Sequence, residues 1–77
     1  MENKILSILS RIRPEFDFQK STSFFDDGML DSFDIVNLVT ELDETYSISI
    51  DGIDIVPENF ANLDTIKKLL VKNGVHA

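Results

Sequence analysis

The chain lacks cysteine altogether, so disulfides and thiolate metal sites are excluded and the redox compartment is left open. It is also short. Its 77 residues suit a single domain, residues 1–77, with no room for a second core. The apolar fraction of 43% and the charged fraction of 27% are ordinary for a globular protein and too apolar for a disordered one. We therefore expect one small folded domain.

Long apolar runs are missing as well. No segment approaches the length needed to span a membrane, and the short apolar stretch after Lys4 is soon broken by Arg11 and Arg13. No small-residue cleavage site follows that stretch, so we read no secretory signal. We expect a cytoplasmic protein with no membrane insertion.

Basic residues are absent from the middle of the chain. Residues 26–64 contain eleven Asp and Glu but no Lys or Arg, and all seven basic residues lie in 4–20 or 67–72. Such an acidic field repels nucleic acid and anionic lipid and attracts basic protein surfaces. Acidic side chains also simply keep small domains soluble, and this alternative stays open. The complete absence of bases favours a recognition surface for proteins, and we expect no nucleic acid partner.

Apolar periodicity predicts three helices. The first runs from about Asn3 to Arg13 and ends there because the residue before Pro14 is pushed away from helical geometry. The second follows Asp31, and we expect Asp34 on its solvent side and Val36 on its apolar side. The third is capped by Asn62 or Asp64. The inward-facing residues of the three helices are Ile5, Ile8, Leu9 and Ile12; Ile35, Val39, Leu42 and Tyr46; and Leu63, Ile66, Leu69 and Leu70.

The connections complete the expected architecture. Residues 15–30 carry six large apolar side chains, too many for a mobile linker, so we predict an ordered loop with a short helical turn near Phe24. Residues 47–50 alternate like a strand but have no strand to pair with, which favours an extended connector. Residues 52–59 allow at most a short helix. The sequence therefore predicts an all-α fold, a three- to four-helix bundle with a long ordered loop between helices 1 and 2.

Ser32 lies where this loop meets the second helix. Asp31 is a natural N-cap, and Asp34 stands three residues later, in the position of a capping-box acid. If Asp31 caps, Ser32 is the first helical residue and its hydroxyl points outward at the positive end of the helix, where a phosphate ester would be favoured. The alternative is that Ser32 is itself the N-cap and has no other role.

Catalysis by Ser32 would need a base nearby, and no His or Lys is close to it in the sequence. His76 is expected to be passive. The segments at Asp26 and Asp51 lack the alternating ligands and closing Glu of a calcium loop, so no metal site is predicted. We expect that the protein is not an enzyme, and that Ser32 is a nucleophile used by another enzyme.

The stretch Gly28-Met29-Leu30-Asp31-Ser32-Phe33-Asp34-Ile35-Val36-Asn37-Leu38-Val39 resembles the attachment-site signature of acyl carrier proteins. In that family an Asp-Ser-Leu or a near variant opens the second helix. The resemblance covers nearly the whole chain, including the phenylalanine pair of the long loop, an Ile-x-Ile connector and a Pro-Glu-Asn-Phe segment before the last helix. It implies that a phosphopantetheinyl transferase attaches 4′-phosphopantetheine from coenzyme A to Ser32, using its own Mg²⁺.

The resemblance further implies that acyl or aminoacyl intermediates are bound to this arm as thioesters, for a specialised biosynthetic pathway or for fatty acid synthesis. A loading ligase or acyltransferase and later pathway enzymes would bind through basic patches to the acidic second helix of a monomeric carrier. The residues that the resemblance nominates for docking are Asp31, Asp34, Glu41, Asp43 and Glu44. Their exposed pairs would be weak and salt-screened, as a shuttle requires.

Two departures and three alternatives accompany this resemblance. Asn37 stands where fatty acid carriers often present an acid, and Phe33 replaces the commoner leucine. The Leu-Asp-Ser-Phe sequence is also similar to the corresponding motif of D-alanyl carrier proteins of cell wall modification, although the Trp and Thr-Pro typical of that group are absent. From other classes, an unmodified acidic helical adaptor for a basic partner and regulatory phosphorylation of Ser32 stay open.

Overall fold

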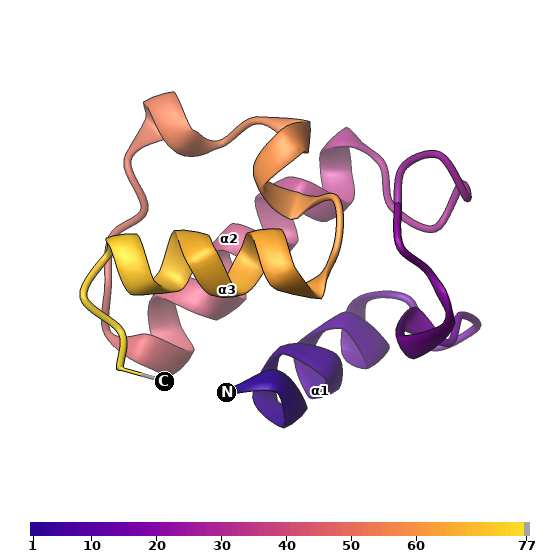
Figure 1. Ribbon diagram of the computed structural model, residues 1–77, viewed down its shortest axis with the longest axis horizontal. Coiled ribbons are helices and arrows are strands. Elements are labelled where there is room, and N and C mark those ends of the chain that lie inside the picture. The colour runs from indigo at the N-terminus through magenta and orange to yellow at the C-terminus, as the bar shows by residue number, and fades with distance from the viewer. Residues whose placement is uncertain (77) are drawn as a thin grey trace.

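The computed structural model describes residues 1–76, which fold into three α-helices joined by short 3₁₀ turns (Figure 1). The elements in chain order are α1 (Glu2–Ile12), η1 (Phe18–Lys20), α2 (Ser32–Tyr46), η2 (Gly52–Asp54), η3 (Pro57–Phe60) and α3 (Leu63–Lys72). No strand occurs within residues 1–76. The predicted all-α class is confirmed. The short fourth helix that the sequence allowed is replaced in this region by the 3₁₀ turns η2 and η3.

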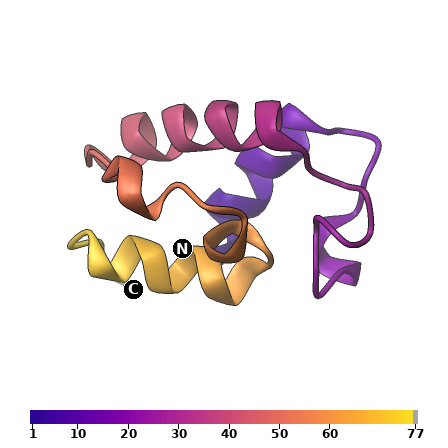
Figure 2. The ribbon, with the colours of Figure 1, turned by 90° about the horizontal axis from the view of Figure 1, so that it is seen from above.

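The three helices leave a long connection, residues 13–31, at one end of the molecule. α1 and α2 run in roughly opposite directions, and the connection lies beyond the end of α1 and the start of α2 (Figure 1). Seen from above, α2 and α3 lie along opposite sides of the molecule, and both run away from the end that the connection closes (Figure 2). The end of α1 and the start of α2 therefore lie at the same end of the molecule as the connection that joins them.

The core is built from every helix and from the connection between α1 and α2. Phe18 and Phe24 lie fully inside and contact each other edge to face, with ring centroids 5.0 Å apart. The backbone N–H of Phe24 donates to the carbonyl oxygen of Ala61 at 2.7 Å, which ties the connection to the segment before α3. The buried apolar residues are Ile5, Ile8, Leu9, Phe18, Phe24, Met29, Leu30, Ile35, Leu38, Val39, Leu42, Ile50, Phe60, Ile66, Leu69 and Leu70.

The start of α3 follows the predicted signal. Asn62 caps α3: its side chain accepts the N–H of Thr65, and the Thr65 hydroxyl oxygen accepts the N–H of Asn62. α2 ends at Ser47, which adopts the left-handed conformation at φ 56°, while Gly74 takes φ 90° after α3. Asp43 also holds the chain beyond α2, because its carboxylate accepts the N–H of Ile50 at 3.0 Å.

Two expectations about the faces of α2 were wrong. Val36 was placed on the apolar side but is 61% exposed, and Asp34 was placed in solvent but is only 7% exposed. Val36 was placed on the inner face because it is apolar. The buried residues Ile35, Leu38 and Leu42 define the inner face of the helix, and Val36 lies outside it. Asp34 is buried because a cation from α1 binds it, as described below. Among residues 1–76 no helix is both long enough and apolar enough to span a bilayer.

Candidate functional site

The start of α2 is held by a reciprocal capping box. The N-cap is Asp31, whose carboxylate accepts the backbone N–H of Asp34 at 3.0 Å. In return, the Asp34 carboxylate accepts the backbone N–H of Asp31, also at 3.0 Å. This pair satisfies helix-end donors that would otherwise lack a partner. The prediction that Asp31 caps α2 is confirmed, and the alternative that Ser32 is the N-cap is wrong.

Ser32 is consequently the first helical residue, and it is exposed. None of the side-chain hydrogen bonds found within residues 1–76 involves its hydroxyl, and the capping is done by its neighbours. The next residue, Phe33, is 83% exposed, and Val36 one turn later is 61% exposed. A free hydroxyl therefore stands at the positive end of α2 beside an exposed apolar patch, Phe33 and Val36.

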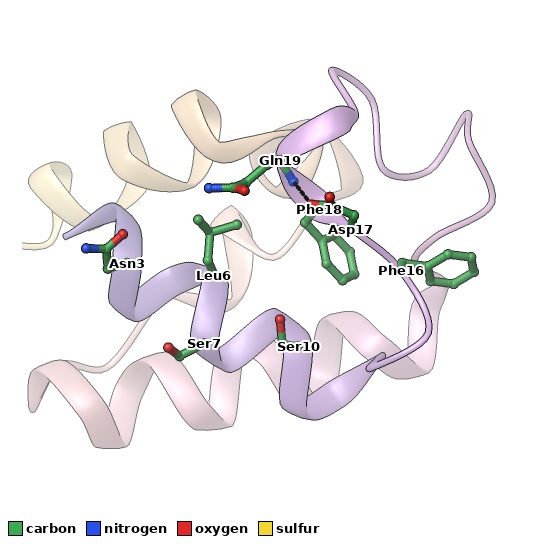
Figure 3. A pocket seen from close by; sticks show the side chains of 8 residues that line it. All are labelled: Asn3, Leu6, Ser7, Ser10, Phe16, Asp17, Phe18 and Gln19. Carbon is green, nitrogen blue, oxygen red and sulfur yellow. Dashed lines mark hydrogen bonds between the residues drawn. The ribbon is translucent and has the colours of Figure 1, made fainter.

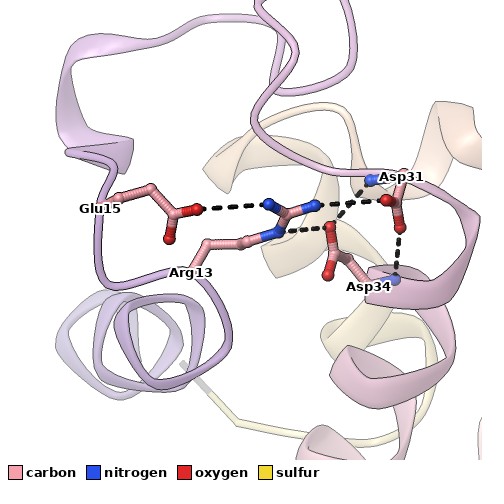
Figure 4. A network of polar contacts seen from close by, with 4 residues as sticks. All are labelled: Arg13, Glu15, Asp31 and Asp34. Carbon is pink, nitrogen blue, oxygen red and sulfur yellow. Dashed lines mark hydrogen bonds and ion pairs between the residues drawn. The ribbon is translucent and has the colours of Figure 1, made fainter.

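Arg13, at the end of α1, binds both members of the capping box (Figure 4). Its Nε donates to Asp34 Oδ2 at 2.9 Å, and its Nη2 donates to Asp31 Oδ2 at 3.2 Å. Its Nη1 donates to Glu15 Oε2 at 3.3 Å. We call these four residues, Arg13, Glu15, Asp31 and Asp34, the Arg13 network. It joins α1 to the first turn of α2 through charge-assisted hydrogen bonds.

The network shifts the pKa of two of its members, Asp31 and Arg13. The pKa of Asp31 lies below its ordinary value, chiefly because the backbone N–H of Asp34 donates to the carboxylate, with the positive charge of Arg13 adding to the effect. The pKa of Arg13 is raised, mainly by its hydrogen bond to the Asp34 carboxylate. Arg13 and Asp31 are therefore both charged at neutral pH.

We predict that Asp31 makes folding stability depend on acid pH. Its folded-state pKa lies below the ordinary value of 3.8, so the contribution is complete above that value and is lost as pH falls through the folded-state pKa. Asp31→Asn keeps the capping oxygen but cannot titrate, so its melting temperature should fall less than that of the wild type in this acid window. Thermal melts across a pH series measure this difference.

The matched control for this prediction is Asp26→Asn, which removes an exposed carboxylate outside the Arg13 network. Its melting temperature should follow the wild-type curve. If Asp31→Asn also followed that curve, the carboxylate of Asp31 would play no part in the acid sensitivity of the fold.

The five nominated docking residues differ in how available they are. Asp34 is buried, and Asp31 is exposed but bound to Arg13. Glu41 pairs with Arg11 at 2.7 Å, and Asp43 is engaged with the N–H of Ile50. Within residues 1–76 Glu44 alone of the five is exposed and without an ion pair. Four of the acids of residues 26–64 thus have counter-charges: Asp31 and Asp34 from Arg13, Glu41 from Arg11, and Asp54 from Lys72 at 2.8 Å.

A groove in the described part of the chain lies away from Ser32. It is an open depression of about 660 Å³ between α1 and η1 (Figure 3). Leu6 and Phe16 line it together with polar side chains of α1 and η1. In the part of the chain that the structure describes, no three His, Asp or Glu side chains are grouped to hold a metal ion. Asp51 instead caps η2 by accepting the N–H of Ile53.

The sequence indicated the capping box and the exposed hydroxyl but gave no sign of the Arg13 network. Arg13 is 18 residues from Asp31 and 21 from Asp34, so local spacing could not connect them.

No protein-family model, no curated protein and no solved structure matches the chain. The candidate site is therefore defined by geometry: an exposed serine hydroxyl on a helix terminus that other residues hold in place.

Proposed function

We propose that this chain is a carrier protein that holds acyl or aminoacyl cargo on a 4′-phosphopantetheine arm attached to Ser32. One observation carries the proposal. The Ser32 hydroxyl is exposed at the first position of α2 and is not used in capping, because Asp31 and Asp34 perform that task. The resemblance of residues 28–39 to the acyl carrier attachment signature names the group that Ser32 would accept.

The surroundings of Ser32 fit such a group. An exposed hydroxyl lets a long arm extend into solvent without displacing the core. A phosphodiester on Oγ would carry negative charge to the positive end of α2, which is favourable. Asp31 would oppose that charge, but its carboxylate is bound to Arg13. The arm, when attached, supplies a terminal thiol on which cargo is held as a thioester.

The attachment step uses Ser32 only as an acceptor. Its Oγ forms a bond to the phosphorus of coenzyme A that bears the pantetheine, and the bond from that phosphorus to adenosine 3′,5′-bisphosphate breaks. The Oγ proton passes to a base of the phosphopantetheinyl transferase, which also brings Mg²⁺. The two carboxylates nearest in sequence, Asp31 and Asp34, both accept hydrogen bonds from Arg13. This arrangement suits a substrate of the transferase better than a catalyst.

Incubation with coenzyme A, Mg²⁺ and a broad-specificity phosphopantetheinyl transferase tests the proposal directly. We expect the intact mass to rise by one phosphopantetheine and by no more than one. A protein that stays unmodified with several such transferases, each active on a reference carrier, would contradict the proposal. The cargo class, including D-alanine, would follow from which loading ligase then charges the modified protein.

The rival adaptor function has one observation in its favour, the exposed patch of Phe33 and Val36. Such a patch could contact a partner without any modification of Ser32. The carrier function uses the same patch, since a transferase that reaches Ser32 must lie against the side chains beside it. The two functions separate on the modification itself, because only the carrier requires a group on Ser32.

We predict that Glu44 contributes to the encounter with the transferase. Glu44→Lys should slow association about two- to five-fold at low salt, since a single exposed charge contributes up to about 1 kcal/mol and is screened by ions. Stopped-flow mixing with the transferase at two salt concentrations measures this. The control Asp64→Lys makes the same change of net charge at the exposed start of α3 and should have less effect. Equal rates for both variants would remove Glu44 from the docking surface.

A further inference from the structure

Arg13 binds the cap of α2 from outside the helix. Its guanidinium donates to Asp34 at 2.9 Å and to Asp31 at 3.2 Å, and these are the same two carboxylates that form the capping box. The side chain of Asp34 is 9% exposed and that of Arg13 is 30% exposed, so the contact is largely shielded from solvent. Shielded, hydrogen-bonded ion pairs of this kind hold geometry more firmly than exposed ones.

In the first turn of α2, Arg13 binds two residues and leaves the two residues between them exposed. Asp31 and Asp34 are three residues apart, so they lie on one side of the helix, facing α1. Ser32 and Phe33 are the two residues between them, and both are exposed. Because the four residues follow one another in one helical turn, fixing Asp31 and Asp34 toward α1 also fixes the direction in which Ser32 and Phe33 project.

We propose that Arg13 is a positioning residue for the modification of Ser32: by binding Asp31 and Asp34 together, it holds the first turn of α2 so that the serine hydroxyl is presented at a fixed place. The inference rests on the proposed carrier function. It assigns to α1 a part in the presentation of a site on α2. Arginine suits the task because its planar fork bonds two carboxylates at once, whereas a lysine ammonium is a point charge on a flexible stem.

A second ion pair between the same helices provides a matched control. Arg11 on α1 contacts Glu41 on α2 at 2.7 Å, with side chains 64% and 36% exposed. Arg11→Gln and Arg13→Gln remove the same charge from the same helix end. Long-range electrostatics would treat the two variants alike, and both would bind a basic transferase faster, since each is more acidic than the wild type. Only Arg13→Gln disturbs the cap beside Ser32.

The test is steady-state kinetics of the transferase with the full-length carrier as the varied substrate, in the presence of coenzyme A and Mg²⁺. We expect Arg13→Gln to lower kcat about ten-fold, because small misplacement of a reacting group costs about that much or more, and Arg11→Gln to leave kcat near the wild-type value. Arg13→Lys should recover only part of the loss. The separation of kcat from KM matters, because weaker docking alone would raise KM and leave kcat unchanged.

A double-mutant comparison assigns the effect to the network. Asp34→Asn and Arg13→Gln should together lower kcat little more than the worse single variant, because both break the same contact. Circular dichroism at the assay temperature checks that each variant is folded. If Arg13→Gln loses its helical signal, the kcat of Arg13→Lys is compared with that of Arg11→Gln instead. A lower kcat for Arg13→Lys supports the inference, and an equal kcat overturns it.

The two proposals fail in different ways. A wild-type protein that no transferase modifies would refute the carrier function itself. A wild-type protein that is modified, with folded Arg13→Gln modified at the same kcat as Arg11→Gln, would leave the carrier function standing and overturn the positioning role of Arg13.

Discussion

Phe60→Ala is expected to remove most of the free energy of folding and to leave the protein only marginally stable at room temperature. Phe60 lies in η3 with no exposed surface and belongs to the core shared by all three helices. Removing a buried phenylalanine side chain costs about 3 to 5 kcal/mol. A domain of this size is expected near the low end of the usual stability range, about 5 kcal/mol. The substitution would therefore cancel most of the free energy of folding.

Thermal and urea unfolding followed by circular dichroism measure this effect. Phe33→Ala is the matched control, because it deletes the same atoms from a side chain that is 83% exposed. It should change the midpoint only slightly. A Phe60→Ala protein that unfolds with nearly the wild-type midpoint would show that η3 contributes little to the core, contrary to the packing described above.

Ser32→Ala is expected to abolish modification completely while leaving the fold intact. The substitution removes the only atom that could accept the phosphopantetheine at this position. It removes no hydrogen bond found within residues 1–76, since the cap of α2 is made by Asp31 and Asp34. Alanine is also favourable within a helix. The helical signal and the melting temperature should therefore be close to those of the wild type.

Mass spectrometry after incubation with the transferase and coenzyme A gives the readout. The control is Ser49→Ala. Ser49 is also exposed but lies outside any helix, and this variant should be modified as fully as the wild type. Modification that persists in Ser32→Ala would place the attachment site on another residue. A large drop in stability would show that Ser32 has a structural role at the start of α2.

The parts of the fold that follow local rules were predictable from the sequence. The apolar stripe of α1 places Ile5, Ile8 and Leu9 inside, and the caps of α2 and α3 follow from residues three apart. Hydrogen bonds between residues this close need only a helical turn, so the spacing of side-chain types determines them. For the same reason, the exposed hydroxyl of Ser32 could be anticipated.

Contacts across the chain could not be predicted in this way. The burial of Asp34 depends on Arg13, which caps the end of another helix and is 21 residues away in the sequence. The sequence showed a central stretch without bases, yet folding brings Arg13 and Arg11 against its acids. Which carboxylates are free for a partner is thus a property of the tertiary structure. In the part of the chain that the structure describes, Glu44 is the one nominated docking residue that is both exposed and without an ion pair.

The same limit explains the segment after α2. The sequence allows at most a short helix over residues 52–59, and the chain forms the two 3₁₀ turns η2 and η3 in this region. Asp51 and Val56 start these turns, and Pro57 stands at the first position of η3. Proline fixes its own backbone angle and lacks an N–H, which suits the first turn of a helix but not its interior. Packing of Phe60 into the core then determines where the turn lies.

The most direct test of the carrier function is the mass of the peptide that contains Ser32, taken from protein purified from its native cells. The carrier function predicts one phosphopantetheine on Ser32, with or without a thioester-bound acyl or aminoacyl group. A single phosphate on Ser32 would indicate regulation by phosphorylation instead. A peptide that is wholly unmodified, in protein isolated under conditions that preserve phosphodiesters, would contradict the carrier function and favour an unmodified adaptor.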